Sequence, residues 1–174
     1  MSKVRIQREY KKLAETPPPG ITCVTKDDNF KVLEISIIGA AGSPYENGVF
    51  HVELHLSDKY PFEPPRMNFV TPIYHPNVDT AGRICLDLLK MPPKGSWKPT
   101  ITLEGLLIAL QSLMTNPNPE DPLMVNIAEE YKYNLPEFNK KAMEWTRLHA
   151  SSNSSTSNIV EVKENHNFLN AANV

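Results

Sequence analysis

Hydrophobic residues near the start of the chain change from a helical to a strand-like spacing. Within residues 3 to 15, Ile6, Tyr10 and Leu13 fall on one stripe, which predicts a short amphipathic helix. The run Pro17-Pro18-Pro19-Gly20 ends this helix, because proline lacks the backbone donor that a helix needs. Beyond it, apolar residues recur at every second position, which is the spacing of half-buried strands.

Three strands can be placed from this alternation. Two are predicted at 33–37 and 50–56, and a loop rich in Gly, Ser, Pro and Asn joins them over 39–48. A third covers 67–71, after a proline-rich turn at 60–65. Connections this short favour an antiparallel meander.

Helical spacing returns in the second half of the chain. Thr102 is a candidate N-cap for a helix whose broad apolar face packs on the sheet. Asp121, followed by proline, is typical of the cap of a short helix that runs to about Lys132. A last helix is expected to begin around 134–136. Its inward-facing residues are predicted to be Phe138, Ala142, Trp145 and Leu148. The order of elements indicates an α+β fold.

Composition favours one domain with a tail. A chain of 174 residues, 40% of them hydrophobic, can bury one sizeable core, which we assign to residues 1–150. Residues 151–174 open on a run of Ser and Asn with nothing to bury, which predicts a disordered tail.

Net charge and the length of apolar runs limit which kinds of partner and location are expected. With 18 basic and 20 acidic residues, the net charge of -2 predicts no general attraction to nucleic acid or to membranes. No apolar run approaches the roughly 20 residues that cross a bilayer. The charged N-terminus lacks the apolar centre of a signal peptide, so we expect a soluble protein in a reducing, intracellular compartment.

Cys85 carries the main chemical question. A free cysteine among apolar neighbours is ordinarily a small buried hydrophobe, and Cys23 fits that interpretation. A zinc site would need about four ligands, and the sequence has no Cys-x-x-Cys pair. A cysteine hydrolase would need an orienting base, yet no histidine lies in a recognisable nucleophile motif. We therefore predict no metal site.

The residues around Cys85 favour an accessible sulfur. The segment from Tyr74 to Leu89, called here the active-site segment, is predicted to have irregular and exposed backbone. The residues that predict this are Pro76, Asn77, Asp79 and Gly82.

Four stretches of the sequence then identify a family. "KYPFEPPRMNF", "HPNVDTAGRICLDLL", "PNPEDPL" and "YNLPEFNKKAMEWT" resemble, in this order along the chain, sequence blocks of the ubiquitin-conjugating enzymes. The resemblance covers residues 1 to about 150 and implies that Cys85 is catalytic. It also implies a fold with an N-terminal helix, an antiparallel four-stranded meander, an irregular active-site segment and helices packed on the sheet.

This family forms a thioester between a cysteine and ubiquitin. Ubiquitin arrives already activated, so sulfur-to-sulfur exchange needs mainly an exposed thiolate and no dedicated base. The chain itself needs no cofactor, since ATP is used upstream by the activating enzyme. When a substrate lysine then attacks, an amide donor can stabilise the oxyanion. The resemblance gives this role to Asn77, with a brace for the loop as the alternative.

Three further residues have implied active-site roles. His75 and Pro76 are expected to be structural and to hold the turn that precedes Asn77. Asp121 is a candidate to orient the incoming lysine and to lower its pKa. A helix cap alone is the other interpretation of Asp121.

The resemblance also implies surfaces for protein partners. Arg5, Arg8, Phe62 and Pro99 would form overlapping sites for the activating enzyme and for RING-type ligases, which would then bind in turn. A solvated helix face is the alternative for the two arginines. On the helix after Thr102, Ile108 and Ser112 lie away from the leucines and are candidates to dock ubiquitin, although single exposed apolar residues are common.

The segment after Cys85 indicates a subgroup. About four extra residues, Pro92-Pro93-Lys94-Gly95, make the chain resemble the T-type ubiquitin-conjugating enzymes. That resemblance implies a monomer in the nucleus, with the cytoplasm as a further location. It would attach single ubiquitins with the RING ligase of the Fanconi anaemia pathway of DNA-crosslink repair.

Lys90 and Lys94 lie close enough to Cys85 in sequence to be candidates for self-modification, although exposed lysines are usually only solubilising. The alternatives for the protein as a whole are a general-purpose conjugating enzyme outside DNA repair and an inactive ubiquitin-binding variant. The inactive variant would be expected to lack the cysteine.

Overall fold

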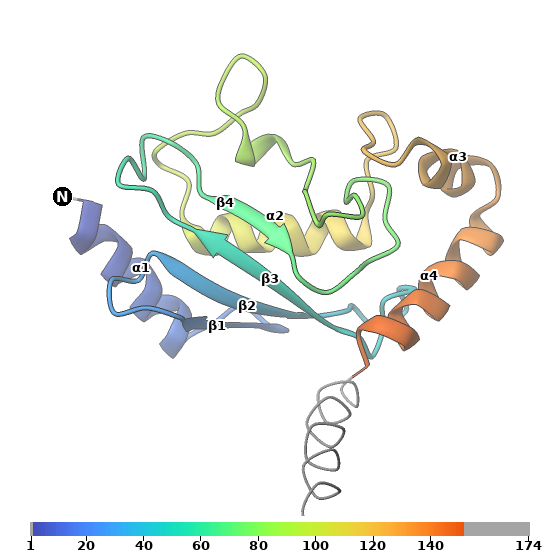
Figure 1. Cartoon of the computed structure of the whole chain (residues 1–174), viewed down its shortest axis with the longest axis horizontal. Helices are drawn as coiled ribbons and strands as arrows, with labels where there is room; N and C mark the ends of the chain where they lie inside the picture. The colour runs from blue at the N-terminus through green and yellow to red at the C-terminus, as the bar shows by residue number, and fades with distance from the viewer. Residues whose placement is uncertain (1, 152–174) are drawn as a thin grey trace, which may run out of the picture.

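The computed structural model describes residues 2–151, which form a four-stranded sheet and four α-helices (Figure 1). The strands are β1 (Ile21–Thr25), β2 (Val32–Ile38), β3 (Val49–His55) and β4 (Arg66–Phe69). They pair antiparallel in the order β1-β2-β3-β4. The predicted α+β fold with an antiparallel meander is confirmed.

β1 is the strand that the hydrophobic pattern did not place. It has only five residues and follows directly on the proline-rich stretch. Its inward residues Ile21 and Cys23 are buried, but the outward Val24 is 60% exposed, so the strand shows no clear polar face. A short strand with apolar residues on both faces gives a weak period-two signal.

The register of the sheet brings one row of side chains to the core. Ile35 pairs with Val52, and both are fully buried. Leu33 and Leu54 form the same kind of buried cross-strand pair. Because side chains alternate between the two faces of a sheet, these pairs fix which face the helices cover.

Two helices cover that face. α1 (Ser2–Glu15) buries Ile6 and Leu13, as predicted. α2 (Leu103–Thr115) runs across the sheet in Figure 1 and buries four leucines and Met114. Its cap is also as predicted, since the Thr102 side chain accepts a hydrogen bond from the Gly105 amide at 3.1 Å.

The last two helices, α3 (Val125–Tyr133) and α4 (Leu135–His149), pack on each other at one end of the sheet (Figure 1). The Val49 amide donates to the Ala150 carbonyl at 2.8 Å, which ties the end of α4 to the start of β3. The active-site segment lies between the sheet and these helices. The exposed course predicted for it is wrong for its first part, since residues 75–78 are buried, and right only in part near Cys85, which is partly buried.

Two predictions about these helices are wrong. Asp121 does not cap α3, which begins at Val125 with Met124 as its N-cap and no capping side chain. The preceding amides of Leu123 and Met124 donate instead to the Pro76 carbonyl, at 2.9 and 3.0 Å. A tertiary contact has therefore replaced the local cap.

In α4, Leu148 is 52% exposed and does not face inward. The buried stripe is Phe138, Ala142 and Thr146, and Leu148 lies about 200° around the helix from Thr146. Trp145 is 40% exposed and sits at the edge of this stripe. The polar Thr146 was missed because its hydroxyl donates to the Ala142 carbonyl, which makes it compatible with burial.

Between residues 2 and 151, no helix combines the length and apolarity needed to span a bilayer. The described residues also contain no cluster of three or more His, Cys, Asp or Glu side chains arranged to bind a metal. Of the tail predicted for 151–174, residues 152–174 lie outside the described residues.

Candidate active site

The active-site segment is anchored to β4 at a glycine. The Phe69 amide donates to the Gly82 carbonyl at 2.9 Å. Gly82 has φ +79°, and a Cβ built there would lie 2.1 Å from the Phe69 carbonyl oxygen. Only glycine allows this conformation and this close approach, so Gly82 fixes where the segment crosses the strand.

His75 anchors the same segment to α2. It is fully buried, its Nδ1 accepts from the Asn77 amide at 3.0 Å, and its Nε2 lies 2.9 Å from the Leu113 carbonyl. The Asn77 contact requires a bare Nδ1, so the hydrogen is on Nε2 and is donated to Leu113. Burial lowers the pKa of His75 to about 4, so the ring is neutral near pH 7. This geometry suits a structural residue.

Asn77 connects the segment to the loop before α3. Its side-chain oxygen accepts from the Asn118 amide at 2.8 Å, and its Nδ2 donates to the carbonyls of Asn118 and Asp121 at 2.7 and 3.1 Å. Both amide hydrogens are therefore in use, since the side chain has two. The amide braces the 118–121 loop here and would have to release one carbonyl to reach an oxyanion. The oxyanion role stays a prediction.

The sulfur of Cys85 lies between a carboxylate and an ammonium group. It is 3.1 Å from Asp121 Oδ2 and 3.1 Å from Lys90 Nζ, and these two groups are 3.4 Å apart. The Cys85 amide donates to the Asn77 carbonyl at 2.8 Å, so the brace and the sulfur are mechanically connected. Cys85 is only partly buried, which leaves the sulfur open to a large partner.

The three groups shift one another's ionisation. Partial burial and the Asp121 carboxylate raise the pKa of the Cys85 thiol, and Lys90 acts in the opposite direction. The contact with the sulfur is the main reason that the pKa of Lys90 is raised. The hydrogen bond from the thiol, followed by Lys90, lowers the pKa of Asp121. Near neutral pH the resting site thus holds a thiol, an ammonium and a carboxylate.

Cys23 has none of these features. It is buried in β1, and burial alone raises the pKa of its thiol to about 11. A thiol that stays protonated inside the core is unreactive. The interpretation of Cys23 as a small buried hydrophobe is confirmed.

The structure brings Arg5 and Pro99 together, but the Arg5 guanidinium is already bonded within the chain. Its guanidinium donates to the Pro99 carbonyl and, at 2.8 Å, to the Ile101 carbonyl, and it also pairs with Glu9. The Arg8 side chain is exposed and has no hydrogen bond or ion pair with any residue in 2–151. Phe62 is 72% exposed, so its ring is available for contact with a partner.

Glu9 holds Arg5 and its neighbours in place, and it was not predicted from the sequence. The buried carboxylate accepts from the Tyr60 hydroxyl at 2.9 Å and from the Leu103 amide at 2.7 Å. It therefore joins α1, the loop that carries Phe62 and the start of α2. The available signal was its spacing of four residues from Arg5, which is typical of a helical ion pair.

The remaining candidates lie on the surface. Ile108 is 47% exposed on α2, and Ser112 is exposed one turn later. Lys94 is exposed, whereas Lys90 faces Cys85. The contact between Lys90 and Asp121 could not be predicted from the sequence, because 31 residues separate them.

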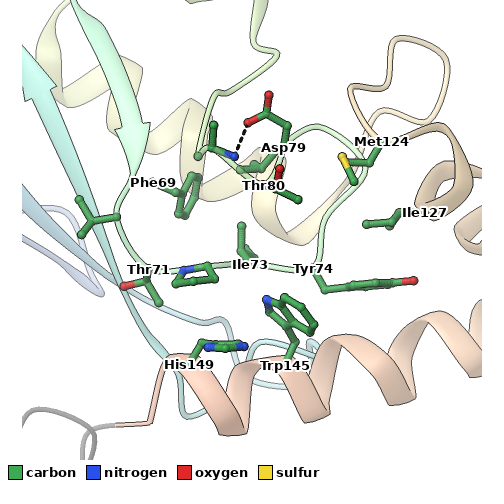
Figure 2. A pocket seen from close by; sticks show the side chains of 15 residues that line it. Phe69, Thr71, Ile73, Tyr74, Asp79, Thr80, Met124, Ile127, Trp145 and His149 are labelled. Atoms are coloured by element: carbon green, nitrogen blue, oxygen red, sulfur yellow. Dashed lines mark hydrogen bonds between the residues drawn. The ribbon is translucent and has the colours of Figure 1, made fainter.

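The active-site segment also forms one wall of a cavity of about 490 Å³ (Figure 2). Trp145 and His149 project into it from α4, and Met124 and Ile127 line another side. The lining is mostly apolar and does not include the three groups at the sulfur. The cavity therefore lies beside the active-site segment and does not contain the sulfur of Cys85.

Comparison with known proteins identifies the family of the chain. Residues 5–146 match the family model described as "Ubiquitin-conjugating enzyme". The chain is 55% identical to "Ubiquitin-conjugating enzyme E2 T" of Bos taurus over 146 residues, which cover 84% of this chain and 75% of that protein. It is 53% identical to the Homo sapiens protein of the same name, covering 84% and 74%. It is 45% identical to "Ubiquitin-conjugating enzyme E2 13" of Saccharomyces cerevisiae, covering 84% and 93%.

Proposed function

The chain belongs to the ubiquitin-conjugating enzyme family, and we propose that Cys85 is the residue on which it carries ubiquitin. As a transferase of this family it works with ubiquitin, an activating enzyme and a ligase. One observation carries the proposal. The Cys85 sulfur is partly exposed and is in contact with both a carboxylate and an ammonium, unlike the buried Cys23.

In the first step, the Cys85 thiolate attacks the thioester carbonyl of ubiquitin on the activating enzyme. A carbon–sulfur bond forms to Cys85, and the bond to the donor cysteine breaks, so that the donor sulfur leaves as a thiolate. No base is needed beyond the solvent that takes the thiol proton. The partly exposed sulfur supports this exchange, because the reacting ends of two proteins must meet there.

In the second step, a substrate lysine attacks the thioester on Cys85. Once the sulfur is acylated, it no longer has a proton to donate to Asp121. The Asp121 carboxylate is 62% exposed and can then accept a hydrogen bond from the incoming amine. Asn77, which holds the Asp121 carbonyl, positions that carboxylate and is the proposed donor to the oxyanion.

Partner surfaces follow from what the side chains already contact. Phe62 and Arg8 are exposed and are the proposed contacts for the activating enzyme and the RING ligase, and the exposed Pro99 completes the proposed surface. Arg5 supports this surface by holding the carbonyls of Pro99 and Ile101. Ile108 and Ser112, on the exposed side of α2, form the proposed ubiquitin-docking surface.

We propose that the protein acts in the nucleus with a RING ligase of the Fanconi anaemia type and attaches single ubiquitins during DNA-crosslink repair. The similarity to relatives named E2 T and the four extra residues after Cys85 support this pathway. Lys90, with its Nζ 3.1 Å from the sulfur, and the exposed Lys94 are the two proposed acceptors for self-modification.

Reconstitution with ligases tests the pathway. The charged protein is mixed with a Fanconi-type RING ligase and its substrate, and in parallel with an unrelated RING ligase. We expect single-ubiquitin product only in the first reaction. Equal stimulation by both ligases, or long chains as the main product, would favour a general-purpose conjugating enzyme.

A further inference from the structure

We propose that Lys90 is a catalytic residue that stabilises the Cys85 sulfur as an anion, and that the turn formed by residues 91–95 places it there. The inference rests on Cys85 being the ubiquitin acceptor. It goes further by assigning a chemical task to the extra residues that follow the cysteine.

Contact with the reacting atom is the first argument. Lys90 Nζ donates to Cys85 Sγ at 3.1 Å, and its side chain is 36% exposed. Lys94, on the same stretch of chain, is exposed and has no hydrogen bond or ion pair with any residue in 2–151. Of the two nearby lysines, only Lys90 is directed at the sulfur.

The backbone of Lys90 is fixed on both sides. Its amide donates to the Asp87 carbonyl at 3.1 Å, and its carbonyl accepts from the Trp97 amide at 3.1 Å. Trp97 is itself buried, and its Nε1 donates to the Pro61 carbonyl at 2.9 Å. The lysine therefore stands on a rigid base, which reduces the entropy lost when its side chain is held on the sulfur.

The 91–95 turn closes directly onto this base. The Gly95 amide donates to the Met91 carbonyl at 3.0 Å, and the Ser96 amide donates to the Asp87 carbonyl at 3.0 Å. A Cβ at Gly95 would lie 2.3 Å from Lys90 Cβ and 2.4 Å from its carbonyl oxygen. The glycine thus lets the extra residues loop out and return without displacing Lys90 (Figure 1).

The charges explain why the sulfur needs a cation. The ionisable groups facing it are Lys90, from the stretch after η1 (Asp87–Leu89), and Asp121, from the loop before α3. In the resting site the thiol donates to Asp121 while Lys90 donates to the sulfur. When the thiol loses its proton to solvent, two anions would face each other at 3.1 Å. Lys90 contacts both and offsets that repulsion.

The same contact serves both halves of the reaction. In charging, Lys90 stabilises the attacking thiolate. In discharge, the bond between Cys85 and the ubiquitin carbonyl breaks and the sulfur leaves as a thiolate, while the amine loses its extra proton to solvent. A leaving thiolate of lower pKa departs faster, so Lys90 assists this step as well.

Alkylation of Cys85 by iodoacetamide tests the inference without ubiquitin. The full chain and its variants are alkylated from pH 6 to pH 10, and the Cys85 and Cys23 peptides are separated by mass. In Lys90→Met we expect the midpoint of the profile to rise and the rate at pH 7 to fall by about threefold or more. Fewer sulfurs are ionised, and the greater nucleophilicity of a more basic thiolate offsets this only in part.

Two matched variants complete the design. Lys90→Arg keeps the cation and should stay within about twofold of the parent rate at pH 7, and Lys94→Met should leave the profile unchanged. An unshifted midpoint in Lys90→Met, or an equal shift in Lys94→Met, would overturn the inference. Gly95→Ala as a single substitution should raise the midpoint. Added to Lys90→Met, it should raise the midpoint no further. An unshifted midpoint in Gly95→Ala would remove the turn from the proposal.

This assay separates the two proposals. A shifted midpoint in a protein that fails to accept ubiquitin would count against the proposed function and leave the contact with Lys90 established. A protein that charges normally with an unshifted midpoint would count against Lys90 alone.

Discussion

At the scale of single residues, burial and hydrogen bonding decide what each polar side chain of the active-site segment does. His75 follows the predicted structural pattern because both ring nitrogens have backbone partners inside the core. The sequence could single out Cys85 as the candidate nucleophile, because the motif around it is contiguous. It could not show that both Asn77 amide hydrogens are taken by carbonyls 41 and 44 residues away. Hydrogen bonds between distant segments depend on the completed fold.

The buried His75 predicts a loss of stability in acid. Its pKa is about 4 in the folded protein, against about 6.5 when unfolded, so only the unfolded chain binds the proton between these values. Its contribution is present above about pH 6.5 and is lost as the pH falls toward 4, by up to about 3 kcal/mol of unfolding free energy. Urea denaturation at several pH values measures this. The pH slope should be smaller in His75→Gln, and an equal slope would contradict the assignment.

Asn77→Ser separates support from chemistry. A serine cannot hold both carbonyls, so the unfolding free energy should fall by about 1–3 kcal/mol. Thioester charging should continue, because the exchange does not use the amide, while transfer to free lysine should slow markedly. Rates of charging and of discharge are measured separately on the same sample. If both rates fell equally, the role in the oxyanion would be wrong.

At the scale of elements, the spacing of hydrophobic residues predicted most strands and helices correctly, and tertiary contacts account for the errors. The alternation in β2 and β3 and the Thr102 cap of α2 are local signals, and the structure confirms them. The Asp121-Pro122 pair has the composition of a helix start. The Pro76 carbonyl instead takes the free amides, and α3 begins later. That displacement leaves Asp121 free to face Cys85.

Arg5 and Arg8 form a matched pair on α1. Arg5→Ala removes the hydrogen bonds to the Pro99 and Ile101 carbonyls and leaves Glu9 without its cation. It should therefore lower the unfolding free energy by about 1–3 kcal/mol and weaken binding to both the activating enzyme and the RING ligase. Arg8→Ala should leave stability unchanged and weaken partner binding only. Thermal denaturation and binding to the activating enzyme and a RING ligase check both. Equal stability of the two variants would show that the Arg5 contacts contribute nothing.

Ile108 tests the exposed side of α2. Ile108→Glu introduces a charge where an apolar residue is 47% exposed, so folding should be unaffected. If this side docks ubiquitin, discharge to lysine should fall several-fold while charging is spared. Ser112→Ala, one turn away, should have a smaller effect. Unchanged discharge in Ile108→Glu would remove the residue from the site.

At the scale of the whole molecule, the site is assembled from segments that the fold brings together. The active-site segment is fixed by β4 at Gly82, by α2 at Leu113 and by the loop before α3 at Asn118. The family could be predicted from the sequence, because it depends on contiguous motifs, and the same motifs carry the proposal that Cys85 is the reacting cysteine. The contacts of the sulfur with Lys90 and Asp121 could not, since they depend on how these anchors orient the segment.

The most direct measurement of the central claim is a charging reaction with activating enzyme, ATP and ubiquitin, resolved on non-reducing and reducing gels. We predict one adduct about the size of a single ubiquitin that disappears with reductant, forms in the parent chain and is absent from Cys85→Ala. A Cys23→Ala variant should charge like the parent chain. Failure of the folded parent chain to form this adduct, or its formation in Cys85→Ala, would contradict the claim that Cys85 carries ubiquitin.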